Sequence, residues 1–417
     1  MGQSGTVRPW LRANAAYAIV AAVGAVALVW LKAWPVYVND YGTEAATAVR
    51  ALVHGHLVLF LQLRPAYGGA FELRAPFILA GSLFDSRTLP LYRAGAVPCL
   101  LAGAVLAIWN VDALRRRGGS TIACLLVIGV CAVNPMTYRA LLSGHPEEVL
   151  AAVLCVAAVL LAMRGRAVAA GVLLGIAIAD KDWSVLALGP VLLGLPAGRL
   201  RACIAAAVTA ALLIAPQFAV LSGNVAARAQ ALAVTDAGDL MHPWNVWWLT
   251  GSPIPLRPQA VGHVIAGGRL AQPWLHGIPH PLIVWLMFPL TWLAVRRRCA
   301  AGDALALLAL LMLIRCVLDP WDVAYYSLPF LLALCSWEVR VGSIAPVRSV
   351  VASLCAWLIF VELPWHLSQD NQSIAFTSLA LLGIALLAHT IYWGNGRSGP
   401  RPAIALRGAV AAPIIDP

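Results

Sequence analysis

The chain has 417 residues, of which 61% are hydrophobic and only 11% are charged, and its mean hydropathy is +0.82. A water-soluble domain cannot bury that much apolar surface, so the composition excludes one and predicts a polytopic membrane protein. The net charge of +11 does not indicate nucleic-acid binding, because the excess basic residues sit in short gaps between apolar runs. Nine cysteines lie mostly inside or beside those runs, which is typical of small buried hydrophobes rather than of a disulfide framework.

Twelve apolar runs approach the roughly 20 residues that a helix needs to cross a bilayer. The predicted spans are approximately 14–33, 90–110, 119–135, 147–163, 166–180, 183–197, 202–220, 278–295, 301–318, 323–339, 347–363 and 373–393. The first run is too long for the core of a signal peptide, so we expect a retained span. We expect one all-α transmembrane domain over residues 1–393, followed by a disordered cytoplasmic tail at 394–417.

The charges divide the gaps between these runs into two alternating sets. Clusters of arginine fill one set, whereas nearly all acids and eight of the nine histidines fall in the other. The positive-inside rule makes the basic gaps cytoplasmic. We therefore expect a multi-pass protein of the plasma membrane, with recognition or chemistry on its extracytoplasmic face.

Two of the predicted outer loops are long, about residues 34–90 and 221–277. In the first loop Ala46, Val49 and Leu52 fall on one side of a helix, which predicts an interfacial helix lying along the membrane surface.

The first candidate site residue is Asp40, which follows the first span and precedes Glu44. A carboxylate at the membrane surface can act as a general base toward a hydroxyl that arrives from the aqueous side. It can equally cap a helix or be an acid kept on the outer side, and its position alone leaves these interpretations open.

A second candidate is the run Gly-His-Pro-Glu-Glu from Gly144 to Glu148, which enters the fourth span from the outer side. Pro146, Glu147 and Glu148 are explained by helix initiation, because proline and acids are favoured in the first turn of a helix. Helix initiation explains His145 poorly, so a functional role for the group stays open.

A third candidate is Lys181, one of only two lysines, in the Gly-rich run from Gly171 to Trp183. A lysine at the outer end of a helix opposes the charge bias of the chain, and binding a phosphate or diphosphate would explain it. A local salt bridge with Asp180 or Asp182 is the alternative interpretation.

A fourth candidate is Arg315, near the end of the ninth span, with Asp319 and Asp322 following it. An ionisable group in a span is costly and is a functional candidate by default. An ion pair between Arg315 and Asp319, one helical turn apart, is the alternative.

Arg64, Glu72 and Arg74 lie in the first long loop, and their spacing does not settle whether they join the same pocket. No HExxH or CxxC motif occurs, and the two histidines that are four residues apart have a proline between them. The sequence thus indicates no metal or other cofactor, although a role for a divalent cation stays open. The absence of Walker and Rossmann glycine motifs disfavours nucleotide-driven chemistry.

Together these segments resemble the integral-membrane GT-C glycosyltransferases, and more closely the actinobacterial polyprenyl-phosphate-mannose-dependent mannosyltransferases (family 87 type). The resemblance covers most of residues 10–393 and rests on Asp40 and on the runs 144–148, 171–183 and 315–326. We expect no separate soluble C-terminal domain, so that acceptor binding would rest on the two long loops.

The resemblance implies an enzyme that moves mannose or another hexose from a polyprenyl-phosphate donor to a lipid or glycan acceptor on the extracytoplasmic face. By the same likeness Asp40 is the base, and Lys181 and Arg315 hold the donor phosphate. The further substrate-binding candidates are Glu44, Arg64, Arg74, His145, Glu147, Glu148, Asp319 and Asp322. The expected partners are the donor, the acceptor and membrane lipids, with no nucleic acid.

A twelve-span transporter is the main alternative. It would place charged groups or broken helices near the bilayer midplane in both halves, whereas the acids here cluster at outer helix ends. A flippase for lipid-linked sugars is a closer alternative, because it too would bind phosphate and sugar. A non-catalytic scaffold of a cell-envelope complex is the third.

Overall fold

The computed structural model describes residues 7–32, 40–63, 69–221, 240–254, 268–342 and 344–394. Seven helical segments within these ranges are long and apolar enough to cross a membrane. The predicted class, an all-α polytopic membrane protein, is confirmed, whereas the count of twelve spans stays a prediction. Arg64 and the predicted tail from residue 395 onward lie outside the described residues.

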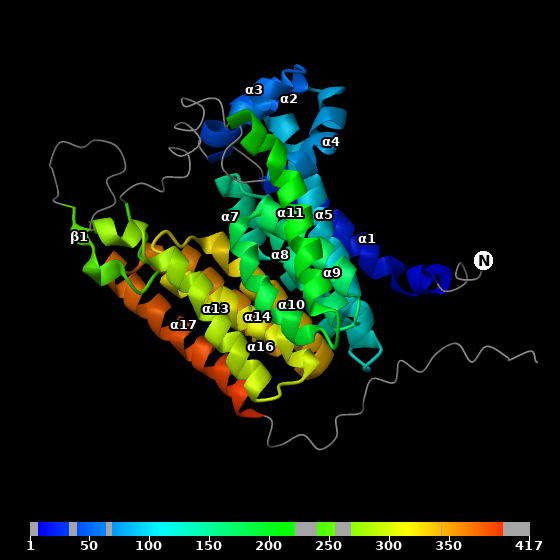
Figure 1. The fold of residues 1–417 in the computed structure, drawn as a ribbon, viewed down its shortest axis with the longest axis vertical. Helices are drawn as coiled ribbons and strands as arrows, with labels where there is room; N and C mark the ends of the chain where they lie inside the picture. Colours follow the sequence, from blue (N-terminus) through cyan, green and yellow to red (C-terminus); the bar gives the residue numbers. More distant parts are fainter. Residues whose placement is uncertain are drawn as a thin grey trace, which may run out of the picture.

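The first part of the chain, up to residue 194, starts with the long helix α1, which is followed by several shorter helices (Figure 1). They are α1 (Val7–Lys32), η2 (Tyr41–Ala45), α2 (Ala46–Val53), α3 (Leu57–Leu63), α4 (Ala70–Ser82), α5 (Thr88–Arg115), α6 (Thr121–Ala132), α7 (Pro135–Ser143), α8 (Glu147–Ala162), α9 (Ala167–Asp180), η3 (Asp182–Ala187) and α10 (Leu188–Gly194).

The later helices form the second part of the bundle, together with a small hairpin. They are α11 (Arg199–Leu221), η4 (Trp248–Thr250), η5 (Pro273–His276), α13 (Pro279–Arg296), η6 (Ala301–Asp303), α14 (Ala304–Leu318), η7 (Ala324–Ser327), α15 (Leu328–Trp337), η8 (Glu338–Gly342), α16 (Val347–Trp357), η9 (Leu358–Glu362), η10 (Leu363–Trp365) and α17 (Gln369–Tyr392). Strands β1 (Ser252–Pro253) and β2 (Arg269–Leu270) pair antiparallel in the second long loop.

Helix α8 lies at the centre of the bundle and packs against α5, α9, α10, α14 and α15. Beyond its first turn it carries only alanine, valine, leucine and cysteine, and 12 of its 16 residues are buried. The four residues that are not buried, Leu150, Leu154, Ala157 and Leu161, follow a helical spacing along one face, so the other faces of α8 make these contacts. The first turn of α8 is therefore held rigidly at one end of the bundle.

Helix α9 packs closely against α11 through Gly171 and Gly175. A Cβ atom at either position would clash with the carbonyl oxygens of Ala202 and Ala206. This is the small-residue spacing with which membrane helices bring their backbones together. The Gly-rich part of the third candidate motif thus builds the fold, and it fixes where the C-terminal end of α9, with Lys181, is placed.

The third predicted span, 119–135, differs from the structure, which has a longer apolar segment broken into α6 and α7. The break falls at Asn134, whose side-chain oxygen accepts a hydrogen bond from Met136 N at 2.8 Å. Pro135 occupies the first helical position of α7, where its missing N–H costs nothing. A new helix therefore starts where the sequence pattern ended the span, and it carries the chain toward His145.

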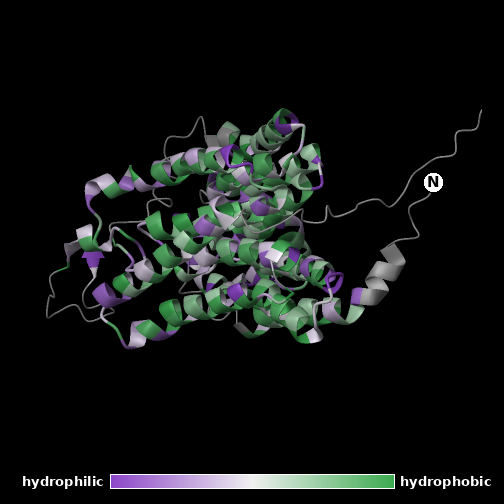
Figure 2. Ribbon diagram, turned by 90° about the horizontal axis from the view of Figure 1, so that it is seen from below, coloured by the Kyte–Doolittle hydropathy of each residue, from purple (hydrophilic) through white to green (hydrophobic). Residues whose placement is uncertain are grey.

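The arginine-rich loops meet at one end of the bundle. Arg115 donates to Asn14 Oδ1 at 2.8 Å, and Arg117 donates to the Val339 carbonyl at 2.7 Å. Arg340 donates to Asn110 and to the Trp109 carbonyl. Figure 2 shows that apolar residues predominate along the helices. Each Asp, Glu, Lys and Arg of the seven membrane-length segments lies within two turns of an end of its segment.

The opposite end holds the described parts of both long loops. Helices α2, α3 and α4 gather there above the bundle (Figure 1). The Gly69 N–H donates to the Ala179 carbonyl, which joins the start of α4 to the end of α9. The second loop is joined to the end of α14 through Val246 N, which donates to the Val317 carbonyl at 2.9 Å. Both loops therefore border the same end of α9 and α14.

Candidate active site

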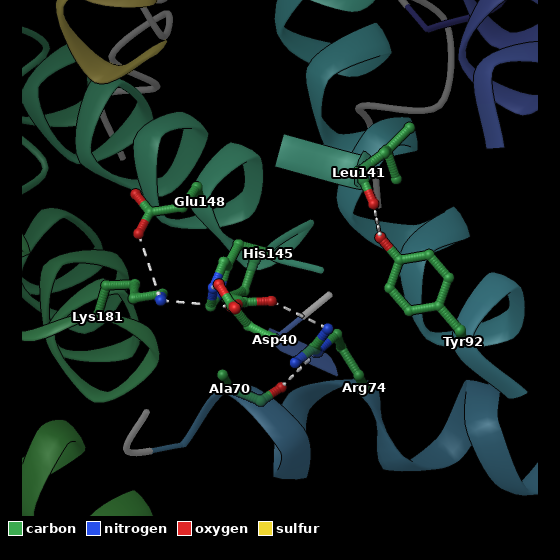
Figure 3. Close-up of polar contacts among 9 residues, drawn as sticks. Asp40, Ala70, Arg74, Tyr92, Leu141, His145, Glu148 and Lys181 are labelled. Carbon is green, nitrogen blue, oxygen red and sulfur yellow. Dashed lines mark hydrogen bonds and ion pairs between the residues drawn. The ribbon is translucent and has the colours of Figure 1, made fainter. Parts of the chain in front are cut away.

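His145 lies in the turn between α7 and α8 and bridges two carboxylates (Figure 3). Its Nε2 is 2.9 Å from Asp40 Oδ2, and its Nδ1 is 2.9 Å from Glu147 Oε1. Because an ionised carboxylate only accepts hydrogen bonds, both ring nitrogens donate when the two acids are charged. The arrangement therefore favours an imidazolium ion.

The pKa of His145 agrees with that geometry. Burial alone would lower the pKa of the imidazole, but the hydrogen bonds to Asp40 and Glu147 outweigh burial and raise it from 6.5 to about 9. His145 is therefore positively charged at neutral pH, and it holds Asp40 by a charge-assisted hydrogen bond.

The carboxylates of Glu147 and Glu148 hold two buried cations. Lys181 Nζ lies 3.3 Å from Glu147 Oε1 and 3.3 Å from Glu148 Oε1, and Arg74 Nη1 lies 3.1 Å from Glu147 Oε2. Burial alone would lower the pKa of Lys181, but Glu148 and Glu147 outweigh burial and raise it. The sequence left open a local salt bridge between Lys181 and Asp180. The structure does not form this pair, since neither buried carboxylate oxygen of Asp180 has a hydrogen-bond partner among the described residues.

Solvent access separates Asp40 from the other carboxylates of this cluster. The side chain of Asp40 is 50% exposed, whereas those of Glu147 and Glu148 are 2% exposed. A group arriving from outside can therefore reach Asp40, while the two glutamates are enclosed by the cations that they neutralise.

Asp40 is positioned by a close approach of backbones at Gly144. Gly144 ends α7 with a φ of +95°, and a Cβ there would lie 2.6 Å from the Tyr41 backbone nitrogen. The Tyr41 ring packs edge-on against Tyr92, whose hydroxyl donates to the Leu141 carbonyl at 2.6 Å. The residue after Asp40 is thus clamped against the end of α7, beside His145.

Arg315 is a buried cation at the end of α14, and its guanidinium group packs against two aromatic rings. Its Cζ is 4.0 Å from the centre of the Tyr326 ring and 4.8 Å from that of Trp183. Its Nη1 is buried without a hydrogen-bond partner among the described residues. The alternative interpretation, an ion pair between Arg315 and Asp319, is not found among the described residues: Asp319 instead accepts from Trp321 N at 3.0 Å and lies 3.5 Å from His280 Nε2.

Asp322 lies beyond Asp319 and is completely buried. Burial raises the pKa of its carboxyl well above the usual range, although contacts with the Val323 N–H and with Cys316 partly oppose that rise.

The structure brings most of the predicted site residues to one end of the bundle. Direct contacts join Asp40, Arg74, His145, Glu147, Glu148 and Lys181. Arg315 borders this cluster through Trp183, two residues after Lys181, and Tyr326 follows Tyr325, whose ring lies 5.2 Å from that of His145. Glu44 lies in η2, the turn that follows Asp40.

Two residues near the site were missed as site candidates by sequence reasoning. His280 contacts Asp319, although its only sequence signal was a proline-interrupted pair of histidines. His242 lies close enough to Asp319 and Asp40 to respond to their charges, and nothing in its sequence context indicated this. Within the described ranges, no group of three or more His, Cys, Asp or Glu side chains could hold a metal ion.

The fold and the site define a class: an all-α polytopic membrane protein with a cluster of acids and cations at one end of its helices. The chain is similar to the alpha-(1->6)-mannopyranosyltransferase A of Mycobacterium tuberculosis, with 29% identity over 320 residues. The match covers 72% of this chain and 57% of that relative. It confirms the resemblance to the actinobacterial mannosyltransferases. No family model and no solved structure matches the chain.

The close approach at Gly144 can be tested with Gly144→Ala. The left-handed φ alone costs about 1 kcal/mol or more for alanine, and the clash with Tyr41 adds to that cost and displaces Asp40. Gly55→Ala is the matched control, because Gly55 has a φ of +77° and open space around its Cβ position. Thermal unfolding in detergent should show the larger loss for Gly144→Ala, and equal losses would contradict the clamp.

The charge on His145 predicts a pH dependence of stability. Because its folded pKa of about 9 exceeds the unfolded value of 6.5, its contribution is complete below pH 6.5 and is lost as the pH rises through 9. The contribution is at most on the order of 3 kcal/mol. The thermal midpoint should therefore fall between pH 6.5 and 9.5, and His145→Gln should flatten that fall. His366→Gln, at an exposed histidine, should leave the profile as it is.

Proposed function

We propose that the chain is a membrane mannosyltransferase that moves mannose from a polyprenyl-phosphate donor to a lipid or cell-envelope glycan acceptor. The relative from M. tuberculosis is named a mannopyranosyltransferase, which supports mannose as the transferred sugar. The observation that carries the proposal is the half-exposed carboxylate of Asp40, held by a charged histidine beside a set of buried cations.

Asp40 acts as the general base. It accepts the proton of an acceptor hydroxyl while the hydroxyl oxygen attacks the anomeric carbon of the sugar, and the bond from that carbon to the phosphate breaks. Among the carboxylates of the cluster, exposure favours Asp40 over Glu147 and Glu148, which are buried against Lys181 and Arg74. His145 is a positioning residue that orients Asp40.

Arg315 and Lys181 bind the donor phosphate. As the sugar leaves, negative charge grows on the phosphate, and a cation already in place stabilises it. Arg315 fits this role well, since its Nη1 has no hydrogen-bond partner among the described residues and its planar fork can bind two phosphate oxygens. The ammonium of Lys181 is already shared between Glu147 and Glu148, so it contributes charge at the edge of the phosphate site.

The site faces the extracytoplasmic side of the plasma membrane. This orientation rests on the arginine-rich loops, which meet at the opposite end of the bundle and are cytoplasmic by the positive-inside rule. The positions of the charges also favour an enzyme over a transporter or flippase, because the membrane-length segments carry charges only within two turns of their ends. The donor is therefore a lipid whose phosphate lies at the membrane surface.

Asp40→Asn tests the base and the proposed activity together. Asparagine keeps the shape and the hydrogen bond to His145 but cannot take a proton, so turnover should fall by about 10²–10⁴-fold while donor binding persists. The measurement is transfer from radiolabelled polyprenyl-phosphate mannose by purified variants. Asp85→Asn, at a surface Asp85–Arg87 pair, is the control. An Asp40→Asn enzyme with most of its turnover would remove Asp40 from the chemistry.

Arg315→Lys tests the phosphate site. A point charge cannot replace the planar fork, and loss of one charge-assisted hydrogen bond of about 1.5–3 kcal/mol should raise the donor KM by about 10- to 100-fold. Lys181→Ala should also weaken donor binding, and it should lower the thermal midpoint because Glu147 and Glu148 lose their partner. Arg87→Lys, at an exposed arginine, is the control. An unchanged donor KM in folded Arg315→Lys would exclude Arg315 from the site.

A further inference from the structure

A groove of about 470 Å³ lies at the arginine-rich end of the bundle, between the turn that leads into α9 and the turn that leads into α11. Residues 165–169 line it from the first turn, and Ala197, Gly198 and Arg201 line it from the second. Its volume falls within the ~300–1,000 Å³ that small-ligand clefts occupy. The groove lies at the end of α9 opposite to Lys181, so it is separate from the candidate active site.

The two turns that form the groove pack against each other. A Cβ atom at Gly198 would lie 3.0 Å from the Ala167 Cβ, and a Cβ atom at Gly165 would lie 3.7 Å from Pro196 Cγ. The helices that follow the turns, α9 and α11, are also in close contact along their length. The groove is therefore a preformed feature of the fold.

The groove carries positive charge that no acid in its walls offsets. Arg166 and Arg201 are its only ionisable lining residues, and both are exposed. Among the described residues neither has an ion-pair partner. The sequence has no Asp or Glu at 149–179 or at 183–235, and Asp112, at the same end of the bundle, pairs with Arg116 at 2.9 Å. The ligand that fits is an anion, and guanidinium groups suit the oxygens of a phosphate.

An apolar stripe runs from the groove along the outer face of α11. At about 100° per residue, Val208 and Leu212 point within about 20° of the direction of Arg201, and Ile204 within about 60°. Ile204, Val208 and Leu212 are 54%, 52% and 70% exposed, although α11 is one of the membrane-length segments. The stripe therefore faces the acyl chains of the membrane.

The length of this stripe matches one leaflet of a bilayer. Leu212 lies eleven residues after Arg201, which is about 16 Å of helix at 1.5 Å per residue. One leaflet contributes about 15 Å, half of the ~30 Å hydrocarbon core. A lipid whose phosphate lies in the groove would extend its acyl chain along the stripe, whereas a free phosphate would use the groove alone.

We propose that the groove lined by Arg166 and Arg201 binds the phosphate of an anionic phospholipid, with an acyl chain lying along Ile204, Val208 and Leu212. Basic pockets between membrane helices bind anionic headgroups in general. The bound lipid holds the start of α9 against the start of α11. This binding is independent of the proposed sugar transfer and can be measured without it.

The test compares the double variant Arg166→Gln/Arg201→Gln with the double variant Arg164→Gln/Arg199→Gln, using the full-length protein in an uncharged detergent. The second variant is the matched control, because it removes the same charge from the same two turns but changes no residue that lines the groove. The probes are dioleoyl phosphatidylglycerol, zwitterionic dioleoyl phosphatidylcholine and soluble glycerol phosphate. Native mass spectrometry gives the Kd of each probe, and thermal unfolding gives the rise in midpoint that each lipid causes.

The wild type should bind phosphatidylglycerol at least about tenfold more tightly than phosphatidylcholine. The groove variant should lose at least about tenfold in that Kd, the effect of a lost charge-assisted hydrogen bond, and phosphatidylglycerol should no longer raise its midpoint. The control variant should stay within about threefold of the wild type, as expected for exposed charges.

Equal losses in the two double variants would overturn the site, and so would a wild type with no preference for phosphatidylglycerol. Glycerol phosphate that binds as tightly as phosphatidylglycerol would overturn the assignment of a lipid. If the groove variant does not fold, Arg201→Gln against Arg199→Gln decides by the same criteria.

Discussion

The bridge that His145 makes between Asp40 and Glu147 is the interaction on which the rest of the site depends. One of its partners is exposed and the other is buried, so the histidine connects a surface carboxylate to a buried network of charges. Buried ions are expensive to desolvate, and they persist only when opposite charges lie close to them. Glu147 and Glu148 supply that compensation for Arg74 and Lys181, which explains why four ionised groups can share one buried region.

The fold places this network by means of small residues rather than large ones. Helix α8 packs against five neighbours through apolar side chains, and Gly171 and Gly175 let α9 lie against α11. A close approach of the same kind occurs at Gly144, where the absence of a Cβ lets Tyr41 contact the end of α7. Each of these contacts sets the position of a charged residue next to it in the chain: Glu147, Lys181 and Asp40.

The two long loops contribute differently to the same end of the bundle. The first brings Asp40 and Arg74 to the charge network, whereas the second is joined to the end of α14. A transferase for a lipid-phosphate sugar needs a charged environment for the leaving phosphate, and the buried cations at this end of the bundle offer one.

The sequence by itself determined the membrane class and the division of charges between the two ends, and it singled out most residues of the candidate site. These follow from composition and from the order of residues along the chain, because each span must be apolar and charges must lie at its ends. The partners of those residues were decided only by the tertiary structure. Asp40 meets His145 across 105 positions, Lys181 pairs with Glu147 and Glu148 rather than with Asp180, and Arg315 faces aromatic rings rather than Asp319. The periodicity of a sequence shows which face of a single helix a residue occupies. These pairs depend instead on how closely neighbouring helices pack. Small residues such as Gly171 allow close packing, but the sequence does not show which helix will be the neighbour.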